Sequence, residues 1–321
     1  MTPPVSPSHT IVVTDSGLGG LSVFAGIAAG LARTAPGSGI HLIYVNAWPE
    51  TDKGYNHYPD MARKAAVFDQ ALAAMARFRP DALVIACNTL SVIYPHTGFS
   101  RTARIPVYDI IDPGVDLAAQ ALKQDPKTCV ILFGTPTTAD AQLHARRLAR
   151  QGFDTARMVS QGCADLAGTI ERNPFDPAID ALIRDNVDQA MSKQAPPCQQ
   201  TAAVLCCTHF GYCRDRFASA LARHTGSVPR ILDPNQDLAD QVVTETEKIL
   251  ALSGAGQGTG PAVQTSGLDL AVFSRVPWDP KKIHAFAALF ESLTPQVARA
   301  LKNYRYNPDL FHIPSEGDPI S

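Results

Sequence analysis

The sequence predicts an α/β protein with two similar domains, each containing a mostly parallel sheet and related to the other by pseudo-two-fold symmetry. Short apolar runs alternate with longer helical stretches, which is typical of parallel sheets. The apolar runs lack polar alternation, as expected of strands buried on both faces. Several landmarks recur after about 120 residues. The active site is expected in the cleft between the two domains.

The expected elements follow one another in a regular order. Stretches rich in glycine, proline, asparagine and aspartate separate the periodic segments and mark turns and loops. In order, we expect strand 11–14, a turn at 15–20, helix 21–33, strand 41–45, loop 48–58, helix 61–77, strand 83–86, strand 130–133, a linker at 253–260, and helices 283–290 and 295–304.

A diverged internal duplication explains the recurring landmarks. The motif DPxxDLA occurs at 112–118 and again at 233–239, an offset of 121 residues. Cys87 and Cys207, each directly after an apolar run, are 120 residues apart. The turn at 15–17 and the turn at 135–137 are separated by 120 residues as well. Two unrelated α/β domains of similar size could also produce similar spacings, but the DPxxDLA match is residue by residue.

Composition excludes several classes of function. The chain has 321 residues, of which 45% are hydrophobic and 18% charged, so it can form a substantial core. The formal net charge is −2 and there is no basic run, which argues against a nucleic-acid partner. The first residues lack the pattern of a secretion signal, and no apolar stretch is long enough to span a membrane. We expect a cytoplasmic protein.

The seven cysteines are expected to be free thiols in a reducing compartment. Cys206, Cys207 and Cys213 form no CxxC pair, so no metal site is expected. Cys129, Cys163 and Cys198 lack a chemical context and are interpreted as structural. Cys206 lies within a strand and should point away from the cleft, because alternate strand residues face opposite ways.

Two facing thiols suggest a specific chemistry. Chemistry in open α/β sheets is located just past the carboxyl ends of the strands, where Cys87 and Cys207 are expected. One thiolate could take a proton from a carbon while the other thiol returns one from the opposite face, which inverts a stereocentre. Asp15 and His209 are candidates to relay protons to Cys87 and Cys207, respectively.

Small polar side chains at the same strand ends suit a carboxylic acid substrate. They can bind an anion without a basic patch, together with backbone amides. The candidate binding residues are Ser16, Asn88, Thr89, Thr135, Thr138 and Thr208. Each feature alone also has a structural interpretation: a buried small cysteine, a tight glycine turn, a hydrogen-bonded core histidine or a helix cap.

Four ordered motifs resemble the cofactor-independent aspartate/glutamate racemase superfamily, and within it glutamate racemase. The turn motif reads DSGLGGLSV at 15–23, CNT is at 87–89, GTPTT is at 134–138, and CTHF is at 207–210. A late TSG at 265–267 also looks like the family's motif near its C-terminus. The resemblance covers roughly residues 10–295.

The resemblance implies a racemase that works without pyridoxal phosphate and needs no cofactor. Cys87 and Cys207 would act on opposite faces of the α-carbon, with help from Asp15 and His209. Glu171 is a further position that matches a family glutamate, although no clear motif surrounds it. The implied activity is conversion of L-glutamate to D-glutamate for peptidoglycan, on a small-molecule substrate.

The resemblance also implies that the first domain regains the C-terminal part of the chain. The expected first domain comprises 10–105 plus 228–300 and carries Asp15 and Cys87. The second comprises 106–227 and carries Thr135 and Cys207. Residues 1–9 and 301–321 are expected to be terminal extensions, with 307–321 on the surface. The oligomeric state is open, and a homodimer is one alternative.

The sequence departs from the family after the second strand. The family has DTAR and then PYG there, whereas this chain has Asn46, Ala47 and Trp48, followed by Gly54 and Tyr55. The identity of the amino acid is therefore open, with aspartate or a hydantoin as alternatives. A thiol-dependent isomerase, decarboxylase or hydrolase of a small carboxylic acid, and a non-catalytic carboxylate-binding protein, are the competing hypotheses.

Overall fold

The computed structural model describes residues 9–194, 198–225, 229–252 and 267–315. The expected linker at 253–260 and two residues of the late TSG, at 265–266, lie outside the described residues. The chain divides into two compact units. Unit 1 comprises the described residues within Met1–Ala86, Ile93–Tyr108 and Gln236–Ser321, and unit 2 comprises those within Cys87–Val92 and Asp109–Asn235.

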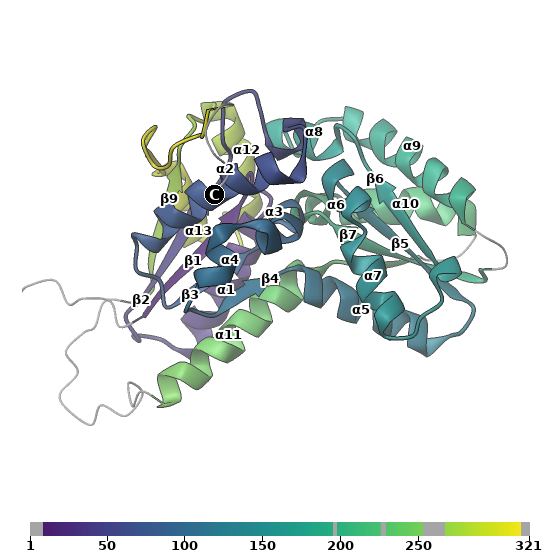
Figure 1. Cartoon of the computed structure of the whole chain (residues 1–321), viewed down its shortest axis with the longest axis horizontal. Helices are drawn as coiled ribbons and strands as arrows, with labels where there is room; N and C mark the ends of the chain where they lie inside the picture. The colour runs from purple at the N-terminus through teal and green to yellow at the C-terminus, as the bar shows by residue number, and fades with distance from the viewer. Residues whose placement is uncertain (1–8, 195–197, 226–228, 253–266, 316–321) are drawn as a thin grey trace, which may run out of the picture. The chain divides into compact units, whose positions relative to one another are not determined.

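The described part of unit 1 contains a six-stranded sheet in the order β10-β9-β2-β1-β3-β4 (Figure 1). The central strand β1 is buried along its whole length, as expected of the apolar run 11–13 at its centre. It pairs in parallel with β2 and β3. The strands are β1 (His9–Asp15), β2 (Ile40–Asn46), β3 (Ala82–Ile85), β4 (Val107–Asp109), β9 (Asp269–Ser274) and β10 (Arg305–Tyr306).

The helices of unit 1 connect and follow these strands. Helix α2 begins where the Asp60 side chain accepts a hydrogen bond from the Arg63 amide at 2.7 Å, and it ends at Ala76. The helices are α1 (Leu21–Thr34), α2 (Met61–Ala76), α4 (Gly98–Thr102), α11 (Pro234–Leu252), which begins in unit 2, α12 (Pro280–Phe290) and α13 (Pro295–Lys302), with short 3₁₀ turns η1 (Tyr55–His57) and η2 (Tyr94–His96).

The described part of unit 2 contains a four-stranded parallel sheet in the order β6-β5-β7-β8. The strands are β5 (Thr128–Gly134), β6 (Met158–Gly162), β7 (Gln200–Cys206) and β8 (Arg230–Leu232). The helices are α3 (Asn88–Ile93), α5 (Ile111–Gln124), α6 (Pro136–Ala141), α7 (Leu143–Arg150), α8 (Leu166–Arg172), α9 (Ala178–Lys193) and α10 (Arg214–Thr225), with 3₁₀ turns η3 (Thr155–Arg157) and η4 (Thr208–Cys213).

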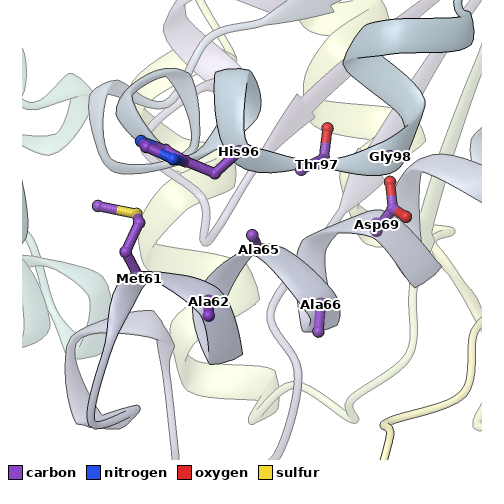
Figure 2. A pocket seen from close by; sticks show the side chains of 8 residues that line it. All are labelled: Met61, Ala62, Ala65, Ala66, Asp69, His96, Thr97 and Gly98. Carbon is purple, nitrogen blue, oxygen red and sulfur yellow. The ribbon is translucent and has the colours of Figure 1, made fainter. Parts of the chain in front are cut away.

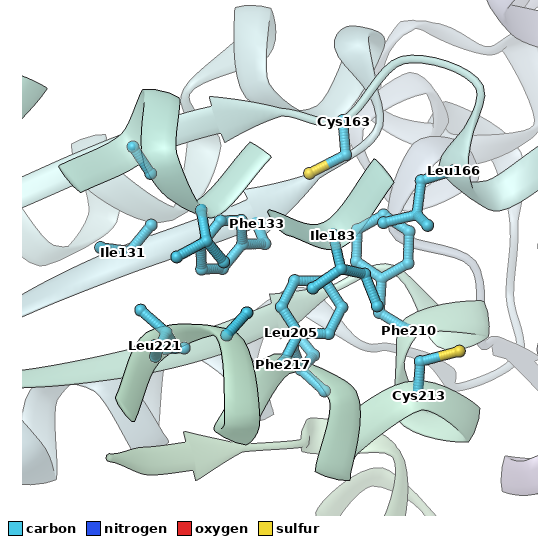
Figure 3. Close-up of a cluster of buried hydrophobic side chains, with 14 of the residues drawn as sticks. Ile131, Phe133, Cys163, Leu166, Ile183, Leu205, Phe210, Cys213, Phe217 and Leu221 are labelled. Atoms are coloured by element: carbon cyan, nitrogen blue, oxygen red, sulfur yellow. The ribbon is translucent and has the colours of Figure 1, made fainter. Parts of the chain in front are cut away.

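The core of unit 2 lies between its sheet and the helices α8, α9 and α10 (Figure 3). Phe133 of β5 contacts Phe217 of α10 with a ring separation of 5.1 Å, and Phe210 lies 5.5 Å from Phe217. Cys207 is one of the buried members of this cluster. The core therefore fixes the backbone on which the second candidate thiol is carried.

Two parallel α/β sheets confirm the predicted fold class. The four strands β2-β1-β3-β4 of unit 1 follow the same order as β6-β5-β7-β8 of unit 2. Both DPxxDLA segments also take the same local place, near the start of a helix that follows a short strand. This correspondence supports the expected duplication.

Three expectations need correction. Cys87–Val92 groups with unit 2, whereas the sequence placed Cys87 in the first domain. For the described residues 301–315 the expected C-terminal extension is wrong as well, because Arg305–Tyr306 adds a strand and both Leu310 and Phe311 are buried. Apolar residues in this part of the chain are covered by unit 1.

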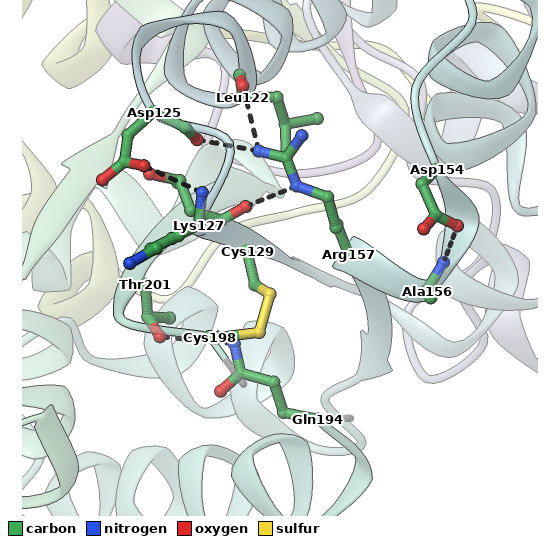
Figure 4. Close-up of a disulfide and its surroundings, with 11 residues drawn as sticks. Leu122, Asp125, Lys127, Cys129, Asp154, Ala156, Arg157, Gln194, Cys198 and Thr201 are labelled. Carbon is green, nitrogen blue, oxygen red and sulfur yellow. Dashed lines mark hydrogen bonds between the residues drawn. A yellow bond between two sulfur atoms is a disulfide. The ribbon is translucent and has the colours of Figure 1, made fainter. Parts of the chain in front are cut away.

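The third correction concerns the expected free thiols. Cys129 of β5 and Cys198, which precedes β7, form a disulfide (Figure 4). Arg157 lies nearby and donates hydrogen bonds at 2.9 Å to the main-chain oxygens of Leu122, Asp125 and Thr128. The disulfide and Arg157 together hold the amino-terminal ends of these strands.

A buried histidine in unit 2 is expected to make the folded protein less stable in acid. His144 of α7 is 3% exposed, and its Nε2 has no hydrogen-bond partner among the described residues. Burial, and secondarily the Arg147 cation, lower its pKa to about 4. Between pH 6.5 and pH 4 the unfolded chain binds this proton and the folded chain does not, so stability falls as the pH falls.

We expect protonation linked to His144 to lower the free energy of unfolding of the wild type by about 3 kcal/mol at pH 4 relative to pH 7.5. Urea unfolding of the wild type and of His144→Leu across this range measures the difference. Other groups titrate in both proteins, so only the difference between their pH slopes reports on His144. Equal slopes would contradict the prediction.

Candidate active site

The structure distributes the predicted site residues between the two units. Asp15 and Ser16 are in unit 1, at the carboxyl end of β1. All the others are in unit 2: Cys87, Asn88, Thr89, Thr135, Thr138, Cys207, Thr208 and His209. Each follows the carboxyl end of a strand, where ligands bind in open α/β sheets.

Three threonine hydroxyls from two motifs meet in unit 2. Thr89 Oγ1 lies 2.8 Å from Thr135 Oγ1 and 3.4 Å from Thr138 Oγ1, and the last two lie 3.0 Å apart. Thr135 also caps helix α6 by accepting a hydrogen bond from the Thr138 amide. The CNT and GTPTT motifs thus form one buried hydroxyl cluster.

Cys87 and Asn88 lie at the start of α3. Cys87 is 6% exposed, and its carbonyl accepts a hydrogen bond from the Ser91 amide at 2.9 Å. Asn88 is buried, and neither polar atom of its side chain has a hydrogen-bond partner within the described residues. An unpartnered buried amide is costly, so Asn88 is a strong candidate for contact with a polar ligand.

Cys207, His209 and Glu171 form a buried line of thiol, imidazole and carboxylate. Cys207 Sγ lies 3.8 Å from His209 Nδ1, and His209 Nε2 lies 2.7 Å from Glu171 Oε2. All three residues are buried. With Nε2–H donating to the carboxylate, Nδ1 is free to accept a proton from the thiol. Acid–base and nucleophilic thiol chemistry both use a thiol, a base and an orienting carboxylate in this order.

The remaining free thiols lack such partners. Burial raises the pKa of Cys206 and of Cys163 far above the usual range, and that of Cys213 to about 11. Cys206 directly precedes Cys207 but is not a member of the cluster that contains Cys207. These cysteines therefore remain protonated and inert at neutral pH.

The second DPxxDLA segment supports the turn that carries His209. The Asn235 side-chain amide donates to the Thr208 carbonyl at 3.2 Å, and the Asn235 amide N–H donates to Asp233 at 3.1 Å. Gly211 fits closely here, because an added Cβ would lie 2.5 Å from Asp233 Oδ2 and 2.8 Å from Asn235 Nδ2. The repeat was visible in the sequence, but its contact with the turn was not.

We expect Gly211→Ala to lower the free energy of unfolding by about 1–3 kcal/mol, because the new methyl group clashes with both side chains. Urea unfolding measures the change. Gly168→Ala in α8 is the matched control, since the nearest neighbouring atom to its added Cβ is Arg172 Nη1 at 3.6 Å. There alanine should be neutral or mildly stabilising. Equal effects of the two substitutions would refute the clash.

Asp15 is held rigidly in unit 1. It is fully buried, and a Cβ on Gly20 would lie 2.7 Å from Asp15 Cβ, so only glycine allows α1 to begin this close. Beside it, the Ala86 amide donates to the Thr14 carbonyl at 2.9 Å, and Cys87 follows Ala86 directly. The main chain before Asp15 and the main chain before Cys87 are therefore neighbours.

A pocket of about 340 Å³ lies elsewhere in unit 1 (Figure 2). It is lined by α2, which contributes three alanines, and by the segment around η2, with Met61 and His96 at one end. Its carboxylate, Asp69, already accepts a hydrogen bond from the Phe99 amide at 2.8 Å. None of the predicted site residues line this pocket.

The fold is α/β, and unit 2 holds a buried line of thiol, imidazole and carboxylate. The model of the Asp/Glu/hydantoin racemase family matches residues 11–242. The chain belongs to this family and is an isomerase of the racemase type. The resemblance read from the four sequence motifs is confirmed.

Named relatives agree with the family assignment. A glutamate racemase from Jannaschia sp. is 26% identical over 292 residues, covering 87% of this chain and 94% of the relative. The crystal structure of a glutamate racemase from Francisella tularensis in complex with D-glutamate superposes with a TM-score of 0.62 at 20% identity, covering 93% of this chain and 97% of the other. A Campylobacter jejuni glutamate racemase has a TM-score of 0.61 at 20% identity, with coverage of 89% and 99%.

Across the described residues, no helix has the length and apolar character needed to cross a membrane.

Proposed function

We propose that this protein racemises glutamate, interconverting the L and D forms. The observation that carries the proposal is the buried line of Cys207, His209 and Glu171, with distances of 3.8 Å and 2.7 Å. A thiol that must act as a base needs a proton acceptor nearby, and the acceptor needs a fixed tautomer. The carboxylate of Glu171 favours the His209 tautomer that carries its proton on Nε2, because that N–H can donate to it.

The proposed reaction moves two protons at one carbon. One cysteine thiolate removes the α-proton from one face, and the thiol of the other cysteine delivers its proton to the opposite face. The α-carbon loses one C–H bond and gains another on the opposite face, so its configuration is inverted. The first cysteine ends as a thiol and the second as a thiolate. In this proposal His209 serves Cys207 and Asp15 serves Cys87, and no cofactor takes part.

The amino and carboxyl groups of the substrate have candidate partners in the same set of strand ends. Asn88 offers a buried amide donor and acceptor, and the hydroxyl cluster of Thr89, Thr135 and Thr138 offers further donors. Ser16 and Thr208 complete the proposed set. Such neutral donors bind a carboxylate without a cationic side chain.

The choice of glutamate rests on the relatives, several of which are named glutamate racemase. By analogy, the product would be D-glutamate for peptidoglycan. The loop after β2 departs from the family pattern at Asn46, Ala47 and Trp48. Aspartate and hydantoins therefore belong in the substrate screen.

Incubation with L-glutamate in deuterated water tests the proposal. The expected products are D-glutamate and L-glutamate that both carry deuterium at the α-carbon, detected by chiral separation and mass spectrometry. Absence of exchange with glutamate, aspartate and a hydantoin would overturn the proposal.

A second candidate function is a thiol nucleophile acting on a small carboxylic acid. The same geometry of Cys207, His209 and Glu171 favours it, because a nucleophile, a base and an orienting carboxylate also form such a line. Mass spectrometry after acid quench distinguishes the two functions. A substrate adduct on Cys207 supports the nucleophile, and an unmodified protein that has exchanged its substrate supports the racemase.

A further inference from the structure

The C-terminal segment, residues 307–315, is tied to unit 1 through its main chain. Its Leu310 and Phe311 are each 4% exposed. Three arginines donate hydrogen bonds to its carbonyl oxygens: Arg63 to Pro314 and Ser315, Arg77 to Leu310, and Arg275 to Phe311. The segment lies beyond residues 11–242, the part of the chain that the family model matches.

Arg275 also reaches a second part of the chain. Its Nε donates to the Phe311 carbonyl at 2.8 Å, and its Nη1 donates to the Pro49 carbonyl. The guanidinium carbon lies 5.6 Å from the centre of the Phe311 ring. One planar, permanently charged group thus joins the C-terminal segment to the loop at 47–58.

The loop at 47–58 begins beside Asp15. Asn46, the last residue of β2, is in register with Asp15, and the Ala47 amide donates to the Asp15 carbonyl at 2.8 Å. The Trp48 amide donates to the Asn46 side chain at 3.1 Å. The loop therefore leaves the sheet at the edge where ligands of α/β proteins bind.

Hydrogen bonds and a ring contact within the loop at 47–58 couple the positions of its residues. Tyr55 donates to the Ala47 carbonyl at 3.1 Å, and Tyr58 donates to Glu50 at 2.7 Å. The Trp48 ring lies against Gly54, where an added Cβ would be 2.5 Å from a ring carbon. A shift of Pro49, which is bonded to Arg275, would therefore move Trp48 and the main chain next to Asp15.

We propose that Arg275 is a positioning residue for the racemase site, which fixes the loop at 47–58 against the C-terminal segment. This inference rests on the proposed function for its catalytic consequence. Arg275 touches no reacting atom; it acts through Pro49 and the loop. Misplacement of groups near a reacting centre by about 1 Å is enough to reduce turnover.

Steady-state kinetics with glutamate give the first test. Arg275→Met should lower kcat/KM about tenfold, and Arg275→Lys, which keeps one donor group, should recover part of the loss. Arg77→Met is the matched control, because it removes a bond to the C-terminal segment without touching the loop. It should stay within about twofold of the wild type. Thermal melting of all variants separates loss of folding from loss of positioning. Equal loss in Arg275→Met and Arg77→Met would overturn the inference.

Fluorescence gives a second test that does not depend on activity. The chain has two tryptophans, so Trp278→Phe leaves Trp48 as the single reporter. Trp278 stacks on Tyr304 at 4.4 Å and its Nε1 has no partner among the described residues, so phenylalanine keeps the stack and loses no hydrogen bond. Acrylamide should quench Trp48 more strongly when Arg275→Met is added, and not when Arg77→Met is added.

The two tests separate this inference from the proposed function. If the wild type racemises none of the amino acids tested, the proposed function fails, and Trp48 quenching still decides whether Arg275 positions the loop. If the wild type is active and Arg275→Met changes neither kcat/KM nor quenching, the inference fails alone.

Discussion

Cys207→Ser is expected to lower kcat for racemisation about 10³-fold, and Cys87→Ser by a similar factor. A serine hydroxyl retains the shape of the thiol but is far less acidic, so it cannot supply the anion that removes an α-proton. Because each cysteine is proposed to act on a different face of the carbon, neither should replace the other. Chiral chromatography of the product measures the loss.

Cys206→Ser is the matched control for this experiment. Cys206 is the preceding residue on β7, is 1% exposed, and has a pKa raised by burial. Its replacement should leave kcat within about threefold, since its thiol remains protonated throughout. An active Cys207→Ser enzyme, or an equal loss in Cys206→Ser, would show that the two-thiol mechanism is wrong.

Glu171→Gln is expected to reduce kcat about 10²-fold. Glutamine has the same shape as glutamate and can still bond His209 Nε2, but it carries no negative charge to stabilise the imidazolium that forms when His209 takes the thiol proton. The same change should slow alkylation of Cys207 by iodoacetamide at neutral pH, because less thiolate is present. Peptide mass spectrometry follows that rate.

A second histidine–carboxylate pair in unit 2 provides the control. His224 Nε2 lies 2.6 Å from Asp188 Oδ1, with the aspartate side chain 63% exposed to solvent. Asp188→Asn should change neither kcat nor the alkylation rate of Cys207. Full activity in Glu171→Gln would show that the Glu171 carboxylate plays no part in the proposed proton relay.

The sequence predicted the strands and the residues that end them because both depend on local chemistry. An unbroken apolar run such as the one before Cys87 is buried on both faces, and small polar residues directly after it mark the end of the strand. The sequence therefore predicts a common site for Thr89 and Thr135. In the structure their hydroxyl oxygens lie 2.8 Å apart.

Glu171 could not be placed in the same way. It is 38 residues from His209 and lies in a short helix, α8, whose orientation depends on packing in the core of unit 2. The bonds of Arg275 to Phe311 and Pro49 were equally hidden, because main-chain carbonyls have no sequence signature. The Cys129–Cys198 bond was missed because the cysteines were expected to lie in a reducing compartment as free thiols.

The disulfide has a practical consequence for anyone who purifies this enzyme. Cys129 is near the amino-terminal end of β5, and Thr135 follows its carboxyl end, roughly 20 Å away for a strand of seven residues. A reductant that keeps Cys87 and Cys207 as thiols can also reduce the disulfide of the half-buried Cys198. The concentration of reductant in the storage buffer therefore decides how much of the protein has the Cys129–Cys198 disulfide and how much is reduced. The amounts of both forms should be measured before activities are compared.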